Sequence, residues 1–207
     1  MTPLRPHTVD FRDAVAWVRG RAFSTGGSVV VGVTGPAGAG KSTLARAVSS
    51  CVLSTDDYLP DYDRVAYHDR DDPAKADLPL LVEHLSLLAV GQRVRVPVWS
   101  FQTHRREGSR EASPADIIVV EGLHALHSTL LPMLHIRVFV DAPRDVRWSR
   151  WEAIETSGER GWGVAVAREF FNAVAEPTYA RFEPLYRSVA DVVVLNHAQD
   201  AGTPALQ

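Results

Sequence analysis

A glycine-rich stretch with one lysine and one serine at fixed positions lies near the N-terminus. Residues 35–42 read Gly-Pro-Ala-Gly-Ala-Gly-Lys-Ser and fit the pattern G-x-x-x-x-G-K-[ST]. Such glycines let backbone N–H groups turn toward phosphate oxygens, and the following helix adds its positive N-terminal dipole. Lys41 would neutralise the β- and γ-phosphates of a nucleotide, and the Ser42 hydroxyl would bind Mg²⁺. The sequence therefore predicts a site for a nucleotide and Mg²⁺.

The surroundings of this loop support the same interpretation. An apolar, β-branched run at 29–33 precedes it, and a helical pattern follows it. Lys41 and Lys75 are the two lysines among 22 basic residues, so a chance match is rare. The alternative is a glycine-rich turn without a ligand, which does not need lysine and serine at these offsets. The predicted nucleotide-binding residues are Gly35, Ala37, Gly38, Ala39, Gly40, Lys41, Ser42 and Thr43.

A bound nucleoside triphosphate can serve a switch, a motor or a phosphoryl transfer. Guanine-binding switches usually carry an Asn-Lys-x-Asp base reader, but neither Asn172 nor Asn196 precedes a lysine. A mechanochemical ATPase usually needs a chain longer than 207 residues. These observations favour an ATP- and Mg²⁺-dependent kinase for a small molecule.

Three further segments carry a family resemblance. They read STDDY at 54–58, VPVWSFQTHR at 96–105 and IVVEG at 118–122. In order and approximate spacing they resemble uridine kinases and the wider uridine kinase and phosphoribulokinase group of P-loop kinases. With residues 190–193, the resemblance covers about residues 28 to 195. It implies a P-loop kinase fold and phosphoryl transfer to the 5′-hydroxyl of uridine or cytidine.

Two acidic residues are candidates for the chemistry. Asp56 follows the short apolar segment 51–53 and should lie at the carboxyl end of a strand beside the phosphate loop. The resemblance implies that it faces the acceptor hydroxyl, whose proton a carboxylate can accept. Asp57 is its rival for this task, and a turn or helix-cap carboxylate is the bland alternative. Glu121 ends a buried strand and is predicted with Ser42 on the Mg²⁺ side; an ordinary strand-terminal acid is its alternative.

The resemblance also implies a pocket for a nucleoside-like acceptor. Trp99 and Phe101 are two residues apart, so in an extended chain they share a face and could stack on a planar base. Core packing of both rings is the equal alternative. The predicted acceptor-binding residues are Asp57, Tyr58, Trp99, Phe101, His104 and Arg105.

A cationic helix face provides candidates for a lid. Arg144, Arg147 and Arg150 are three residues apart, and such a face could close over the phosphates. Arg150 and Arg160 match the family's lid arginines best, and with Asp56 and Lys41 they form the predicted catalytic set. A solvated basic face paired with nearby glutamates is the alternative.

Other polar groups are interpreted as structural. Asp69, Asp71 and Asp72 are expected to lie in a solvated loop, with a ribose-binding role as the alternative. His124 and His127 lack an evident third ligand, and kinases hold Mg²⁺ on oxygen atoms, so a metal role is not favoured.

Some positions depart from the family pattern and leave the acceptor open. Trp99 stands where a tyrosine is usual, and Ile154 and Trp162 stand where lid arginines often lie. Pantothenate, nicotinamide riboside or a sugar could serve as acceptor instead. A non-catalytic nucleotide-binding switch is the alternative from a different class.

The elements that must position these residues form a recognisable pattern. Four short apolar runs, at 29–33, 117–120, 136–140 and 192–195, read as buried strands. Helical patterns separate them, which indicates an α/β fold with a parallel β-sheet flanked by helices on both faces. Further predicted elements are helices over 8–20, 78–91, 144–154 and 164–186, the last kinked or divided at Pro177 and Pro184, and an edge strand over 94–98.

Length and composition bound the remaining possibilities. The 207 residues predict a single domain, with an N-terminal helical extension (1–27), a lid-like helical region (142–163) and a tail (196–207). The net charge of −3 disfavours nucleic-acid and membrane-surface partners. One cysteine excludes an intrachain disulfide, and no apolar run approaches the ~20 residues of a membrane span. We expect a cytoplasmic protein; a homo-oligomer stays open.

Overall fold

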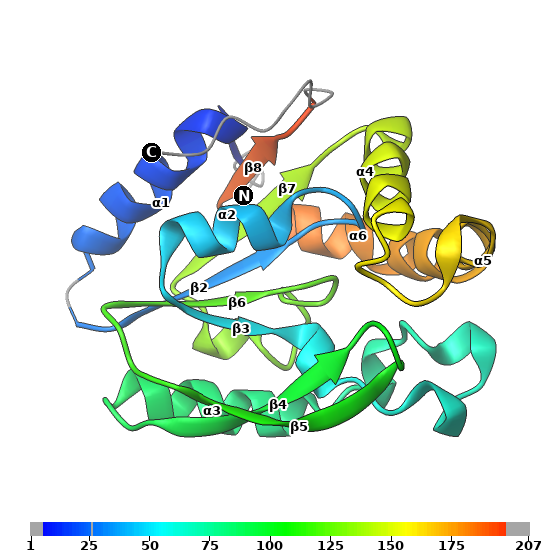
Figure 1. The fold of residues 1–207 in the computed structure, drawn as a ribbon. Coiled ribbons are helices and arrows are strands. Elements are labelled where there is room, and N and C mark those ends of the chain that lie inside the picture. Colours follow the sequence, from blue (N-terminus) through cyan, green and yellow to red (C-terminus); the bar gives the residue numbers. More distant parts are fainter. Residues whose placement is uncertain (1–5, 26, 198–207) are drawn as a thin grey trace.

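A parallel sheet forms the centre of the part of the chain that the structure, a computed structural model, describes: residues 6–25 and 27–197 (Figure 1). Within these residues the sheet has six strands in the order β1-β8-β7-β2-β6-β3, and all neighbours run parallel. Their bounds, in that order, are His7–Asp10, Val192–Leu195, Ile136–Asp141, Val29–Thr34, Ile117–Glu121 and Cys51–Ser54. The four predicted strands and their parallel arrangement are confirmed.

Helices cover both faces of this sheet (Figure 1). One face packs against α1 (Phe11–Phe23) and α2 (Lys41–Val48), and the other against α3 (Leu78–Ala89) and α6 (Glu176–Val189). Successive side chains of a strand point to opposite faces, so Val29 and Val31 of β2 join the first core and Val30 joins the second. The expected α/β fold with helices on both faces is confirmed.

The predicted helix over 164–186 is interrupted. A π-helical segment, Phe171–Ala175, separates α5 (Gly163–Phe170) from α6, and it ends just before Pro177. Pro184 lies inside α6 and does not divide it. The lid-like region contains α4 (Arg144–Thr156), which follows β7. Short 3₁₀ helices occupy Thr55–Tyr58, Tyr62–Arg64, Tyr67–Asp69, Pro73–Lys75 and Leu131–Met133.

The N-terminal prediction needs correction. Residues 7–10 do not begin a helix; they form β1, which pairs with β8 at the edge of the sheet. The helix begins at Phe11, because the backbone before it is extended and takes its hydrogen-bond partners from β8. Residues 7–10 of the expected extension are therefore part of the sheet, and 11–23 form α1. Residues 1–5 and 26 lie outside the described residues.

The predicted tail also begins too early. Asn196 is buried, and its backbone N–H donates to the Asp141 carbonyl at 2.8 Å. Residues 198–207 lie outside the described residues. None of the described helices combines the length and the apolar character that a membrane crossing requires.

A small antiparallel hairpin lies beside the main sheet. The predicted edge strand is β4 (Val94–Ser100), which pairs with β5 (Arg105–Ala112) in a sheet of its own. The sequence analysis missed β5, because its exposed, charged residues show no apolar alternation. Val94, Val96 and Ala112 pack into the core around α3. The hairpin thereby carries its tip, residues 101–104, toward the end of the main sheet.

Candidate active site

The phosphate loop joins β2 to the first residue of α2, as the sequence predicts. Gly38 has a φ of 78°, and a Cβ there would overlap the backbone carbonyl of Arg147. Both constraints require glycine. No side chain caps the first backbone N–H groups of α2. This geometry suits an anion at the loop.

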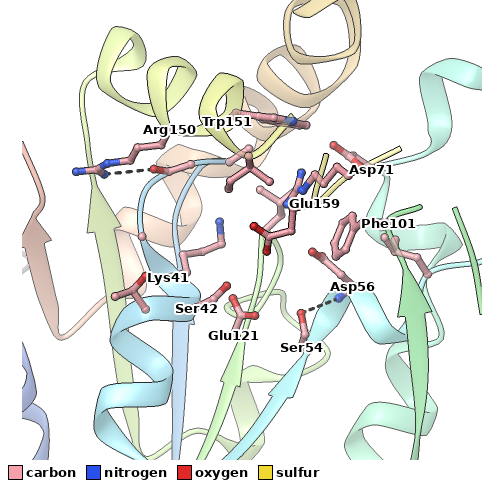
Figure 2. A pocket seen from close by; sticks show the side chains of 18 of the residues that line it. Lys41, Ser42, Ser54, Asp56, Asp71, Phe101, Glu121, Arg150, Trp151 and Glu159 are labelled. Atoms are coloured by element: carbon pink, nitrogen blue, oxygen red, sulfur yellow. Dashed lines mark hydrogen bonds between the residues drawn. The ribbon is translucent and has the colours of Figure 1, made fainter. Parts of the chain in front are cut away.

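A cavity of about 1320 Å³ opens at the carboxyl ends of β2, β3 and β6. Figure 2 shows the side chains of Lys41, Ser42, Asp56 and Glu121 around this space. The predicted residues that line the cavity are Ala37, Gly38, Gly40, Lys41, Ser42, Thr43, Asp56, Asp57, Phe101, His104, Glu121, Arg150 and Arg160. The predicted residues that do not line it are Gly35, Ala39, Tyr58, Trp99 and Arg105.

The strand register explains why distant residues meet here. Glu121 is paired with Val33 of β2 on one side and with Ser54 of β3 on the other. The chain leaves β2 for the phosphate loop, and it leaves β3 for the turn that carries Asp56. Parallel strands end at one edge of the sheet, so these groups converge.

Lys41 is almost completely buried in the loop. Its Nζ donates a hydrogen bond to the carbonyl of Pro36 at 3.0 Å. Burial lowers the pKa of the ammonium, while the charges of Glu121 and Asp56 act in the opposite direction. The lysine is therefore held in the cavity beside two carboxyl groups.

These two carboxyl groups are buried together. Burial raises the pKa of Asp56, and burial with the neighbouring Asp56 raises the pKa of Glu121 to about 6. The nearby hydroxyls of Ser54 and Ser42 act in the opposite direction on the Glu121 pKa. The backbone N–H of Asp56 donates to Ser54 Oγ at 3.3 Å, which fixes the start of the turn.

The donor set fits Mg²⁺ bound partly by phosphates and water. The described residues contain no group of three or more histidine, cysteine, aspartate or glutamate side chains that could hold a metal by itself. The hydroxyl of Ser42 and the carboxyl of Glu121 offer hard oxygen ligands next to the phosphate loop. Protein sites for Mg²⁺ commonly supply one or two such groups and leave the other positions to substrate and water.

Asp57 and Tyr58 have structural contacts. Asp57 Oδ1 accepts from the Trp99 N–H at 3.1 Å, and its Oδ2 lies 3.6 Å from Arg110, so this carboxylate ties the turn to the hairpin. Tyr58 is fully buried, and its hydroxyl bonds to His84 Nδ1 at 2.7 Å. Tyr58, which is predicted to bind the acceptor, does not line the cavity, because its side chain belongs to the core around α3.

Only some of the predicted acceptor-binding residues of the hairpin line the cavity. Trp99 is buried and packs on Tyr62 at a centroid distance of 5.0 Å, and Arg105 points outward to Asp63 at 2.9 Å. Neither of these two predicted acceptor-binding residues lines the cavity. Phe101 and His104 do line the cavity. Trp99 and Phe101 both pack against one hydrophobic cluster, with Trp99 buried in it and Phe101 half-buried beside the cavity, so the core-packing alternative describes Trp99.

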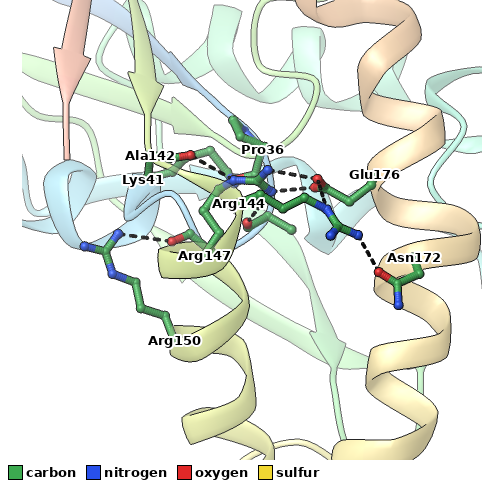
Figure 3. Close-up of polar contacts among 10 residues, drawn as sticks. Pro36, Lys41, Ala142, Arg144, Arg147, Arg150, Asn172 and Glu176 are labelled. Carbon is green, nitrogen blue, oxygen red and sulfur yellow. Dashed lines mark hydrogen bonds and ion pairs between the residues drawn. The ribbon is translucent and has the colours of Figure 1, made fainter. Parts of the chain in front are cut away.

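The three arginines of α4 have different partners and do not form one cationic face (Figure 3). Arg147 is buried and donates to the carbonyls of Ala142 and Ala37 and to both carboxylate oxygens of Glu176. Arg144 also reaches Glu176, at 3.3 Å. Arg150 instead donates to the Gly38 carbonyl at 3.3 Å. Of these three arginines, Arg150 lines the cavity, and Arg144 and Arg147 do not.

Asp71 lies at the site, which was the less favoured expectation from the sequence. It was expected in a solvated loop, but only 6% of its surface is exposed, and it lines the cavity. Tyr62 donates its hydroxyl to Asp71 Oδ1 at 3.3 Å, and burial together with the charge of Asp56 raises the Asp71 pKa to about 7. His124, which bonds to the Asp71 carbonyl at 2.7 Å and to Tyr186 at 2.8 Å, holds the backbone in place. No local sequence pattern predicts these contacts.

Comparisons with known proteins agree with this geometry. The family model described as "Phosphoribulokinase / Uridine kinase family" matches residues 58–200. A uridine kinase of Lactobacillus johnsonii is 32% identical over 181 residues, covering 80% of this chain and 85% of the relative. A uridine kinase of Clostridium novyi is 30% identical over 186 residues, covering 83% and 89%.

Solved structures show the same fold. A candidate fructose transport system kinase from Silicibacter sp. TM1040 superposes with a TM-score of 0.69 at 17% identity, covering 86% of this chain and 98% of the other. A candidate uridine kinase from Bacillus stearothermophilus superposes with a TM-score of 0.58 at 20% identity, covering 89% and 98%. The phosphate loop precedes the residues that the family model matches, so it is independent support for the same kind of protein.

Proposed function

The chain belongs to the phosphoribulokinase/uridine kinase family and is a small-molecule kinase; on that premise we propose that it transfers the γ-phosphoryl group of ATP to the 5′-hydroxyl of uridine or cytidine. The observation that carries this proposal is the convergence of Lys41, Ser42, Asp56 and Glu121 in one cavity at the end of the sheet. It acts as a single kinase domain, in which residues 142–163 serve as the lid.

The donor occupies the phosphate loop. Backbone N–H groups from Gly35 to Thr43 surround the β- and γ-phosphates, and Lys41 neutralises their charge. Ser42 and Glu121 would hold Mg²⁺, which would supply positive charge beside the phosphates of the donor. The buried carboxyl groups beside Lys41 support this assignment, because burial raises the pKa values of Asp56 and Glu121 and a bound cation would favour their charged forms.

Asp56 activates the acceptor. Its carboxylate accepts the proton of the hydroxyl group while the acceptor oxygen bonds to the γ-phosphorus. The bond between that phosphorus and the β–γ bridging oxygen breaks, and ADP leaves with the electron pair. Arg150 and Arg160, which line the cavity from the lid side, stabilise the charge on the transferring group.

The acceptor lies between Asp56 and the hairpin tip. Asp71 and His104 line this end of the cavity, so they offer one carboxyl group and one ring to a nucleoside-like molecule. Burial lowers the pKa of His104 to about 4, so its ring is neutral at pH 7 and can both donate and accept hydrogen bonds. A sugar, pantothenate or nicotinamide riboside is the alternative acceptor class.

A panel of acceptors separates these possibilities. Uridine, cytidine, nicotinamide riboside, pantothenate and simple sugars are each incubated with the protein and Mg·ATP or Mg·GTP, and release of the nucleoside diphosphate is followed. Release that depends on uridine or cytidine supports the proposal, and dependence on another acceptor replaces it. Background release with every acceptor, while ATP raises the melting temperature, would favour a nucleotide-binding switch.

A further inference from the structure

The hairpin tip and the segment that follows α4 are joined by backbone contacts. The N–H of Gly161 donates to the carbonyl of Phe101 at 3.1 Å, and Gln102 Nε2 donates to the carbonyl of Gly158 at 2.7 Å. These two segments are about 60 residues apart in sequence, and both contribute side chains to the cavity wall. The wall of the cavity is therefore closed by contacts between the hairpin and the lid-like region.

The approach of the two backbones depends on a glycine. A Cβ at Gly161 would overlap the carbonyl oxygen of Gln102, and the overlapping group is backbone and not a flexible side chain. Next to it, His104 and Trp162 stack with ring centroids 4.2 Å apart and an angle of 7° between the rings. Close backbone packing and ring stacking thus bring the two segments together on either side of Arg160.

Arg160 is held between two rings. Its guanidinium carbon lies 4.3 Å from the ring centroid of Phe101 and 5.0 Å from that of Trp151. Phe101 belongs to the hairpin tip, whereas Trp151 belongs to α4 and packs edge-on against Phe171 at 5.5 Å. A guanidinium group is attracted to the faces of aromatic rings, so this pair of rings sets the direction of the side chain.

The position of Arg160 matters for the reacting groups. Burial raises the pKa of the Asp56 carboxyl and the charge of Arg160 opposes this rise; burial lowers the pKa of the Lys41 ammonium and the same charge adds to that fall. Arg160 therefore acts on both the acceptor and the donor sides of the cavity. Because the Phe101 ring faces this guanidinium, that face of the ring is not available to stack on an acceptor. Sequence analysis assigned the ring to the acceptor.

We propose that Phe101 is a positioning residue for Arg160. The hairpin tip holds the arginine over the space beside Asp56, through the Phe101 ring and the backbone bond to Gly161. This inference rests on the proposed function, in which Arg160 stabilises the charge on the transferring phosphoryl group. This contact links the acceptor side of the cavity to Arg160, the cation that acts on the phosphoryl donor.

Steady-state kinetics with Mg·ATP and uridine test the inference. Phe101→Leu keeps an apolar side chain and removes the ring; we expect kcat to fall ~10-fold, while KM for uridine changes by less than ~2-fold. Phe101→Tyr keeps the ring face and should restore kcat. Phe23→Leu, the same substitution on an exposed ring of α1, is the matched control and should leave the kinetics unchanged.

A double-mutant cycle with Arg160→Lys decides whether the Phe101 ring acts through Arg160 or contacts the acceptor itself. If Phe101 acts through Arg160, the double variant Phe101→Leu/Arg160→Lys is about as active as Arg160→Lys alone. The proposal is overturned if the two losses multiply, or if Phe101→Leu raises KM for uridine at unchanged kcat. In that second case the ring contacts the acceptor itself.

Hydrogen exchange keeps the inference testable without an active acceptor. In the full chain without ligand, the amides of residues 158–163 should exchange faster in Phe101→Leu and in Gln102→Ala than in the wild type, and equally fast in Phe23→Leu. Unchanged exchange in both hairpin variants would overturn the positioning role. Absence of phosphoryl transfer by the wild-type protein with every acceptor would instead count against the proposed function, and the exchange result would still stand.

Discussion

Arg147 and Glu176 form a two-point ion pair, in which Arg147 Nη1 and Nη2 lie 2.5 and 2.8 Å from the two carboxylate oxygens. The side chains are 8% and 19% exposed, so the pair is largely shielded from water. Arg147 also donates to the carbonyl of Ala37 in the phosphate loop, at 3.3 Å. The pair therefore links α6 to the backbone that receives the nucleotide.

Replacing Glu176 should weaken both stability and nucleotide binding. Glu176→Ala leaves a shielded arginine without its anionic partner, which we expect to cost about 2 kcal/mol of unfolding free energy and to raise KM for Mg·ATP several-fold. Thermal unfolding and steady-state kinetics measure these effects. Glu183→Ala is the matched control, because Glu183 pairs with Arg187 on the same helix and is 35% exposed. Equal effects of both variants on KM would contradict the link to the loop.

Asp56 and Lys41 should separate into different kinetic roles. Asp56→Asn removes the base but keeps the shape, so turnover should fall at least ~100-fold while Mg·ATP binding is retained. Lys41→Ala should lower turnover by at least ~100-fold and weaken Mg·ATP binding as well. Turnover is measured by ADP release and binding by calorimetry. Near-wild-type turnover of Asp56→Asn would remove Asp56 from the role of base.

The raised pKa of Asp71 predicts a pH dependence of stability. Its pKa rises from 3.8 to about 7 on folding, so the folded protein keeps a proton that the unfolded chain releases. The folded state binds more protons in this range, and its stability therefore falls as the pH rises from about 4 to about 7. The amide introduced by Asp71→Asn cannot titrate. In the absence of ligands, the melting temperature of Asp71→Asn should therefore rise relative to that of the wild type as the pH increases from 5 to 7.5. Asp69→Asn, at an exposed position, is the control, and a constant difference for Asp71→Asn would contradict the prediction.

Tyr58 should matter for stability and not for the acceptor. Tyr58→Phe removes the buried hydrogen bond to His84 and leaves the ring in the core, at an expected cost of about 1 kcal/mol. KM for the acceptor should stay unchanged, because Tyr58 does not line the cavity. Denaturant unfolding and kinetics on the same preparation check both statements. A rise in acceptor KM without loss of stability would return Tyr58 to the binding site.

The sequence by itself determined the parts of this protein that local patterns encode. The phosphate loop between 35 and 42 is contiguous, and its neighbouring strand and helix follow from apolar periodicity. Asp56 and Glu121 were found because each follows a buried strand, and parallel strands end at one edge of a sheet. Composition and motif order together indicated the α/β kinase fold.

Only the tertiary structure decided which polar and aromatic side chains reach the cavity. Asp71 enters it because His124 and Tyr186, more than 50 residues away, hold its backbone, whereas Tyr58 and Trp99 are withdrawn into cores. Arg147 turns to Glu176, while Arg160 turns to Phe101. Such choices depend on partners that meet only after the chain has folded, since burial and ion pairing are properties of the assembled neighbourhood and not of sequence spacing.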